Sequence, residues 1–258
     1  MPTALAIAAH PDDIELMMAG TLFLLRDRGW DLHYWNLADG RCGSNEHDAE
    51  QIVAIRDQEA RAAADRLGAR FHEPIRRDLE IFYESDLIRR ICAVVRSVTP
   101  DAVFLQSPED YMEDHMNASR ASVTAVFARS MRNYPSIPPR DAIEKDVAVY
   151  HALPYGLRGQ LGEPVLPHFI VDIEATLESK LGMLAEHASQ RRWLDVSQGL
   201  DSYVETAREM AREVAGLAGG LPVSYAEGWR RHLELGLHRP GYDPVATVLS
   251  DLVVPISR

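Results

Sequence analysis

Short apolar segments alternate with longer helical stretches along this chain, and this alternation limits its fold more than any other feature. The expected strands lie at residues 4–9, 32–37, 102–106, 147–151 and 169–173, with a weaker strand at 70–72. The expected helices between them span residues 15–28, 48–67, 85–98 and 115–132. Helices that separate short buried strands are typical of βαβ units. The pattern therefore predicts an α/β fold, with a Rossmann-like, mostly parallel sheet and helices on both faces.

The C-terminal part is expected to extend this fold with helices and loops. Helical patterns occupy residues 174–191 and 201–215, while a Pro-rich stretch at 135–140 and a Gly/Pro-rich stretch at 154–167 indicate functional loops. A length of 258 residues is ordinary for one α/β domain with a sizeable core. We therefore predict that residues 1–258 form a single domain.

Composition and charge exclude several classes of protein. Apolar residues make up 46% and charged residues 26% of the chain, which is a globular balance. The net charge of −12 argues against binding to nucleic acid or to an anionic membrane. Cys42 and Cys92 are the only cysteines, so neither a disulfide framework nor a thiolate zinc cluster is expected. No segment reads as a signal peptide or as a membrane span, so we expect no membrane insertion and a cytoplasmic location.

The first expected strand leads directly into residues 10–15, which read His-Pro-Asp-Asp-Ile-Glu. The handover from a strand to a helix at the edge of a parallel sheet is where α/β proteins keep their sites. Asp12 followed three residues later by Glu15 also matches a capping box, so a helix cap is the structural alternative for this carboxylate. A cap needs only one short polar side chain, whereas His10 and a second aspartate share this turn. The motif therefore favours a metal site with its own base.

A third metal ligand is expected from the stretch that follows the strand at 102–106. That stretch leaves the same edge of the sheet as His10 if the two strands are parallel, and it contains His115. A catalytic zinc ion takes three protein ligands and keeps a further position open. Asp114 precedes His115 in the sequence and is expected to orient the imidazole ring of His115.

Residues 10–15 resemble the signature of the PIG-L or LmbE-like family of zinc-dependent N-acetylglucosaminide deacetylases. Further segments match the family in its own order over nearly the whole chain. They are residues 36–43, Arg56 and Glu59, Asp114 and His115, residues 171–173, Lys180, residues 187–190 and residues 225–229.

The resemblance implies that His10, Asp13 and His115 bind zinc and that Asp12 is the general base. A set of two histidines and one aspartate is not strongly selective, so another divalent metal ion is a second possibility. Zinc lowers the pKa of its bound water to about 7 and polarises the amide carbonyl. A carboxylate beside the metal can take the proton of that water and pass it to the leaving amine.

The resemblance also implies where the sugar binds. Arg56 is expected to reach the sugar or an anionic group on it, because a guanidinium suits pairs of hydroxyls and phosphate. The alternative is a salt bridge on the helix surface with Asp57 or Glu59. Asp39 and Gly40 are expected to line the same mouth of the site.

The chain departs from the family at Met112, where many members carry a histidine that stabilises the oxyanion and protonates the leaving group. Methionine cannot donate a hydrogen bond, so the metal ion alone, Tyr111 or His151 is expected to take over this task. The alternative for His151 is a polar residue without a role in the reaction.

The implied activity is hydrolysis of an N-acetyl group on an N-acetylglucosamine-type amino sugar or its conjugate. The alternatives are an amidase that acts on a larger N-acyl conjugate and a degenerate member that binds metal without turnover. A nucleotide-binding regulatory protein is disfavoured, because no Gly-x-Gly-x-x-Gly or Gly-Lys-Ser/Thr loop follows any expected strand. The expected partner is a small amino-sugar substrate, and the resemblance further implies a homo-oligomer.

Overall fold

A mixed sheet of eight strands forms the centre of the computed structural model, which describes residues 1–198 and 203–256, with only the backbone for 195–198. The strand order is β3-β2-β1-β4-β5-β7-β6-β8. The strands are β1 (Thr3–Ala8), β2 (Asp31–Asn36), β3 (Arg70–His72), β4 (Ala102–Leu105), β5 (Ala148–Ala152), β6 (Phe169–Asp172), β7 (Ala226–Arg231) and β8 (Val253–Pro255). The first five strands in this order pair in parallel, whereas β7, β6 and β8 pair antiparallel. The prediction of a Rossmann-like, mostly parallel sheet is confirmed.

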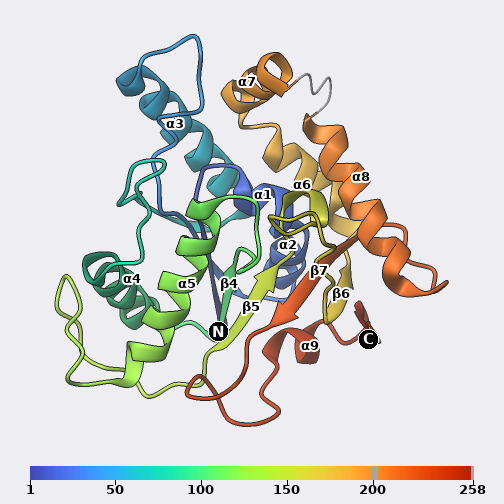
Figure 1. Cartoon of the computed structure of the whole chain (residues 1–258). Helices are drawn as coiled ribbons and strands as arrows, with labels where there is room; N and C mark the ends of the chain where they lie inside the picture. The colour runs from blue at the N-terminus through green and yellow to red at the C-terminus, as the bar shows by residue number, and fades with distance from the viewer. Residues whose placement is uncertain (199–202, 257–258) are drawn as a thin grey trace.

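Helices cover both faces of this sheet (Figure 1). They are α1 (Asp13–Met17), α2 (Ala19–Asp27), α3 (Ala49–Leu67), α4 (Ser85–Val98), α5 (Glu113–Phe127), α6 (Leu177–Leu184), α7 (Ala188–Gln198), α8 (Tyr203–Ala215) and α9 (Pro244–Val248).

The alternation of side chains along β1 shows why two layers of helices are needed. Ala4 and Ala6 belong to the hydrophobic cluster that includes side chains of α2, α3, α6 and α8. Leu5 and Ile7 point to the other face, into the cluster of α4 and α5. Successive side chains of a strand face opposite sides, so an apolar run such as β1 is buried on both faces.

Several expected elements differ from the structure in their extent, among them three helices and the helix expected at 115–132, which ends at Phe127. The helix expected at 15–28 is divided into α1 and α2, because Met18 leaves helical geometry with φ −132°. The helix expected at 174–191 is broken at residues 185–187, between α6 and α7. The first two residues of the helix expected at 201–215 lie outside the described residues, and α8 accounts for the rest.

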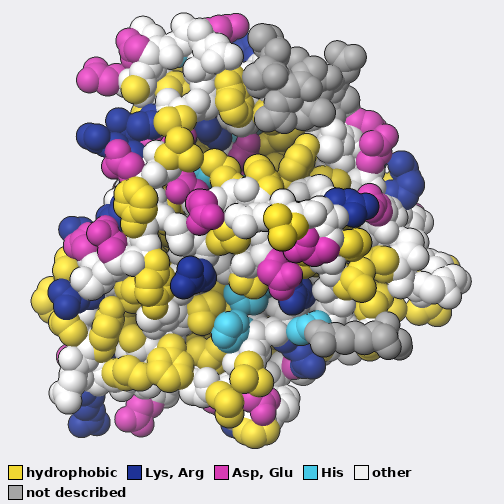
Figure 2. Space-filling model, viewed as in Figure 1, with side chains coloured by type: hydrophobic (Ala, Val, Ile, Leu, Met, Phe, Trp, Pro, Cys, Tyr) yellow, Lys and Arg dark blue, Asp and Glu magenta, His cyan; other side chains and the backbone are white. Residues whose placement is uncertain are grey.

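Strands from both ends of the chain join the same sheet, since β8 pairs with β6 at one edge. The single domain over residues 1–258 stays a prediction. On the face that Figure 2 shows, acidic and basic side chains are interspersed. Among residues 1–198 and 203–256, no helix has the length and hydropathy that a membrane crossing requires.

Candidate metal centre

The edge of the sheet at the carboxyl ends of β1 and β4 brings the sequence motifs together. These strands are parallel neighbours, with Ile7 paired to Leu105, and the strand order reverses direction at β1. Such a reversal is the usual position of a ligand site in an open α/β sheet. β1 runs upward from the N-terminus in Figure 1, so this edge lies in the upper half of the view.

His10, Asp13 and His115 form a compact group at this edge. One ligand atom from each lies within 4.8 Å of the others, and all three residues are buried. The carboxylate of Asp13 lies between the two imidazoles, with Oδ2 at 3.5 Å from Nδ1 of His10 and Oδ1 at 3.4 Å from Nε2 of His115. Their geometry agrees with the ligand set expected from the sequence, and their binding of a metal stays a prediction.

Two further carboxylates bond to the ring nitrogens that point away from Asp13, which we call the outer nitrogens. Oδ2 of Asp114 lies 3.1 Å from Nε2 of His10, and Oδ1 of Asp110 lies 3.0 Å from Nδ1 of His115. The expectation that Asp114 orients His115 is therefore wrong. Adjacent residues of a helix do not face each other, so Asp114 turns toward His10 and Asp110 takes the expected place. Such carboxylates fix the ring orientation of metal-binding histidines.

The electrostatics of the group favour a positive charge at its centre. Burial alone would lower the pKa of His10, but the carboxylates of Asp114 and Asp13 outweigh it and raise this pKa to about 10. Burial likewise opposes the charge on Asp13, yet His115 and His10 bring the pKa of this carboxyl well below its usual range. Two imidazoles and a carboxylate are also donors that suit a catalytic divalent ion. The residues present therefore fit a metal ion.

Asp12 stands beside this group with an unusual backbone. Its φ of 107° is left-handed, and its side chain makes no cap hydrogen bond to α1, so the capping alternative is wrong. Oδ2 accepts a hydrogen bond of 2.5 Å from the hydroxyl of Tyr203, and Oδ1 lies 3.8 Å from a guanidinium nitrogen of Arg56. Burial raises the pKa of Asp12 to about 6, although Arg56 opposes this shift.

A cavity of about 390 Å³ opens over these side chains. Its lining includes the expected site residues His10, Asp12, Asp13, Arg56, Tyr111 and His115. The other lining residues are Leu16, Cys42, Gly43, Asp78, Leu79, Met112, Tyr155, Gln190, Trp193, Leu194 and Tyr203. The size is typical of a small-molecule site.

Arg56 is deeply buried, with 2% of its surface exposed. Its guanidinium donates hydrogen bonds to the carbonyl oxygens of Pro11 at 2.5 Å and Gly40 at 3.2 Å. Asp57 and Glu59 bond to other partners, so the surface salt bridge is not formed. Arg56 thus connects the turn that carries Asp12 to residues 40–43, which we call the glycine loop. Its contact with a sugar stays a prediction.

Asp39 and Gly40 lie behind the cavity wall. Asp39 forms a salt bridge of 2.8 Å with Arg41 and lines a separate, smaller hollow. Gly40 has a φ of +77°, and a Cβ there would meet the side chain of Arg56 at 2.7 Å, so glycine permits the close approach. The expectation that these two residues line the mouth is corrected, because residues 42–43 of the same loop do so instead.

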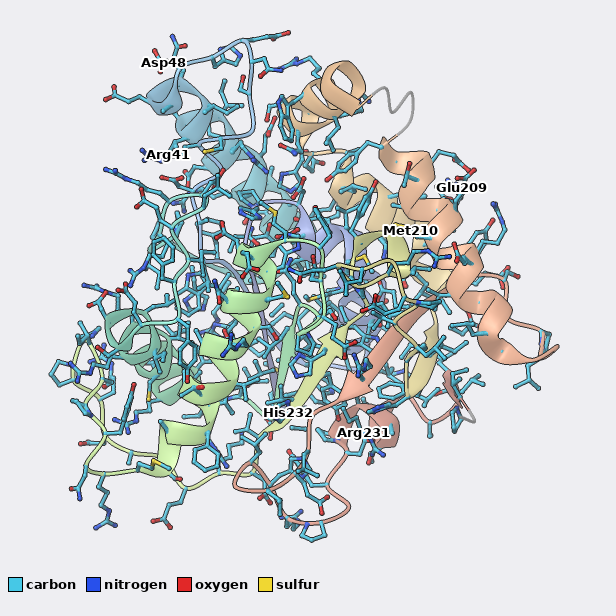
Figure 3. The ribbon with its side chains drawn as sticks, in the orientation of Figure 1. Arg41, Asp48, Glu209, Met210, Arg231 and His232 are labelled. Carbon is cyan, nitrogen blue, oxygen red and sulfur yellow. The ribbon has the colours of Figure 1, made fainter. Side chains whose placement is uncertain are left out.

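The expected substitutes for the missing histidine differ in their placement. Tyr111 lines the cavity with its ring edge-on to His115, the two ring centroids lying 5.5 Å apart. His151 is buried in β5, with Nδ1 at 3.0 Å from the carbonyl oxygen of Gln106 and Nε2 at 3.0 Å from Nδ1 of His232. His232 lies in the lower part of Figure 3, whereas Arg41, which directly precedes the lining residues Cys42 and Gly43, lies in the upper part. His151 does not line the cavity, so its expected role at the oxyanion is corrected.

Several lining residues were missed at the sequence level. Tyr203 and Trp193 come from α8 and α7, which no local motif connects to the site. Asp78 accepts hydrogen bonds from the backbone N–H groups of Gly40 at 2.7 Å and Cys42 at 2.9 Å, and so holds the glycine loop. The match at residues 187–190 was the only signal for this side of the cavity.

Known proteins resemble this chain over much of its length. Residues 5–126 match the family model described as "PIG-L: GlcNAc-PI de-N-acetylase". The diacetylchitobiose deacetylase of Thermococcus kodakarensis is 27% identical over 190 residues, which cover 72% of this chain and 69% of that protein.

Solved structures share the fold over most of the chain. The N,N′-diacetylchitobiose deacetylase of Pyrococcus horikoshii superposes with a TM-score of 0.74 and 25% identity, covering 93% of this chain and 87% of that one. The 4-carboxy-2-hydroxymuconate hydratase of Pseudomonas putida KT2440 has a TM-score of 0.76 at 24% identity, covering 90% of this chain and 97% of that one. This likeness shows the fold alone. Together with the motif at residues 10–15, the match over residues 5–126 supports the PIG-L family for this chain.

Proposed function

We propose that this protein is a metal-dependent N-deacetylase that acts on an N-acetylglucosamine-type amino sugar or its conjugate. The observation that carries the proposal is the placement of Asp12, His10, Asp13 and His115 in one cavity, with Asp12 outside the group that could hold the metal. The deacetylases of Thermococcus kodakarensis and Pyrococcus horikoshii support an N-acetylated amino sugar as the substrate class.

In this proposal His10, Asp13 and His115 hold the metal ion. When bound, the ion supplies Lewis acidity toward the amide carbonyl oxygen and the attacking water. Asp12 accepts the proton of that water as it attacks the acetyl carbon. The same carboxyl then delivers the proton to the amine nitrogen as the C–N bond breaks, which releases acetate and the free amino sugar.

The neighbours of Asp12 give this carboxylate a defined orientation. Tyr203 donates to one oxygen, and the guanidinium of Arg56 lies near the other. We assign Tyr111 as the hydrogen-bond donor toward the carbonyl oxygen, because it lines the cavity beside His115 and Met112 cannot donate.

The charges of the lining do not by themselves select between a neutral and an anionic substrate. Among the lining residues that the structure describes, Arg56 is the single arginine or lysine, and it already bonds to two backbone carbonyls. Asp12, Asp13 and Asp78 contribute carboxylates to the same cavity. With the divalent ion that the proposal places at His10, Asp13 and His115, the ion and Arg56 together balance these three carboxylates.

The test combines metal content with product release. We expect about one divalent ion per chain in the purified protein, as for catalytic zinc sites, and acetate release from N-acetylglucosamine or N,N′-diacetylchitobiose that stops on chelation. His115→Ala is expected to lose both. Absence of bound metal after incubation with excess zinc would overturn the proposal. Metal binding without release of any acyl group would identify a degenerate member, and release of only larger acyl groups an amidase.

A homo-oligomer and a cytoplasmic location stay predictions from the sequence and are part of this proposal.

A further inference from the structure

One wall of the cavity is largely apolar, and apart from Tyr111 its residues have no part in the proposed reaction. We call Leu79, Tyr111, Tyr155, Trp193 and Leu194 the apolar wall. Its members come from the turn after β3, the loop before α5, the 3-10 turn Tyr155–Leu157 and α7. Four segments distant in sequence thus contribute apolar side chains to the cavity that holds the candidate metal ligands.

The aromatic side chains of the wall lie next to a candidate metal ligand. The ring of Tyr111 lies edge-on to His115 at an interplanar angle of 82°, and its centroid lies 6.3 Å from that of Tyr155. More than half of Tyr111, 55%, is exposed. An apolar substituent next to the reacting amide would therefore meet aromatic surface at once.

Leu79 carries two unfavourable features that packing in the free protein does not explain. Its φ of 63° is left-handed, which costs a non-glycine residue about 1–2 kcal/mol. The residue is nevertheless 60% exposed, so little burial offsets that cost.

The backbone of Leu79 is held in place by a carboxylate that also contacts a candidate metal ligand. Its N–H donates a hydrogen bond of 2.6 Å to Oδ2 of Asp114, the same oxygen that lies 3.1 Å from Nε2 of His10. The conformation of Leu79 and the orientation of His10 therefore depend on one carboxylate. This contact fixes an aliphatic side chain at the cavity mouth in a conformation that glycine would adopt more readily.

We propose that the apolar wall selects substrates that carry an apolar substituent beside the hydrolysed amide, with Leu79 as a specificity-determining residue. This inference rests on the proposed function and names its substrate class. The substituent belongs either to the acyl group or to the aglycone of the amino sugar, and both present the same chemistry to the wall.

Two substrate series separate these sources. The first is glucosamine N-acylated with acetyl, butanoyl or hexanoyl groups, and the second is N-acetylglucosamine as its methyl, butyl or hexyl β-glycoside. With zinc-loaded protein, we expect kcat/KM to rise about three- to fourfold per buried methylene in one series. A flat or falling kcat/KM in both series would overturn the proposal.

A pair of matched variants tests Leu79. Leu79→Asn keeps the backbone N–H, tolerates the left-handed conformation and removes the apolar side chain. We expect it to lower the ratio of kcat/KM between the hexyl and methyl members. Leu235, 71% exposed and outside the cavity lining, provides the control, and Leu235→Asn is expected to leave this ratio unchanged. An equal ratio in both variants would contradict the role of Leu79.

A binding measurement separates this proposal from the proposed function. Alkyl β-glycosides of glucosamine and N-alkylglucosamines contain no amide, so their calorimetric affinities do not depend on turnover. Affinity that rises with chain length, without deacetylation of any substrate, would retain the apolar wall and overturn the deacetylase. Turnover with affinities and kcat/KM values independent of chain length would retain the deacetylase and overturn the wall.

Discussion

The hydroxyl of Tyr203 donates a hydrogen bond of 2.5 Å to Oδ2 of Asp12, a residue 191 positions earlier in the chain. Both residues are buried, and the guanidinium of Arg56 lies 3.8 Å from the other oxygen of the carboxylate. The proposed base is therefore oriented from both sides, by α8 and by α3.

Tyr203→Phe is expected to reduce kcat with little change in KM or in metal content. A hydrogen bond to a charged group contributes about 1.5–3 kcal/mol, so the loss in kcat is expected to reach about tenfold or more. Steady-state kinetics and metal analysis of the variant test this. The matched control is Tyr225→Phe, which changes a tyrosine outside the cavity lining and is expected to keep full activity. A kcat equal to the wild-type value would exclude a positioning role for Tyr203.

Asp12→Asn is expected to retain the metal and to lose most activity. General acid–base catalysis typically contributes about 100-fold to 10,000-fold, and an amide cannot accept the proton that the mechanism requires. Acetate release and metal content measured on one preparation test both parts. Asp251→Asn, at a surface carboxylate paired with Arg28, is the control for the substitution itself. Full activity of the Asp12 variant would exclude it as the base.

Asp110→Asn and Asp114→Asn are each expected to weaken metal binding without abolishing it. Each carboxylate holds the outer nitrogen of one candidate ligand, and loss of such a partner typically costs about 10-fold to 100-fold in metal affinity. Competition with a zinc chelator measures the affinity directly. Wild-type affinity in both variants would show that other contacts orient the imidazoles.

The sequence was sufficient to predict which residues lie together at the centre of the candidate site, because their placement depends on local patterns. The apolar run of β1 and the motif at residues 10–15 are continuous in sequence, and parallel pairing of β1 with β4 brings His115 to the same edge. Asp110, and not Asp114, contacts His115, because the rotation of one helix turns Asp114 toward His10. A sequence motif does not encode this rotation.

Features that depend on tertiary packing were missed. β7 reads Ala-Glu-Gly-Trp-Arg-Arg and lacks the apolar pattern of a strand, since Glu227 is buried with Lys180 at 2.6 Å and accepts hydrogen bonds from backbone N–H groups of α2. Tyr203 likewise gains its role only because α8 packs over the cavity. Neither arrangement has a signature in the local sequence.

Leu79→Gly is expected to leave stability unchanged or to raise it slightly. Relief of the left-handed strain gains about 1–2 kcal/mol, while the greater freedom of glycine in the unfolded chain costs about 0.4–1 kcal/mol. Leu235→Gly changes another exposed leucine, which has no positive φ, and it is expected to lose about 0.5–1 kcal/mol. Urea unfolding of both variants measures the difference. A larger loss at Leu79 than at Leu235 would contradict the strain argument.

His151 is expected to make the stability of the protein depend on pH. Burial lowers its pKa to about 4, although the carbonyl oxygen of Gln106 opposes this shift, whereas an unfolded histidine titrates near 6.5. Between these values the unfolded state binds more protons, so the stabilisation is present above about pH 6.5 and is lost as the pH falls toward 4. From about pH 7 to about pH 5 this group alone is expected to remove about 2 kcal/mol. Urea unfolding of the wild type and of His151→Gln at both pH values tests the prediction, because the variant should lose less stability on acidification. Equal losses in the two proteins would show that His151 does not titrate on unfolding in this range.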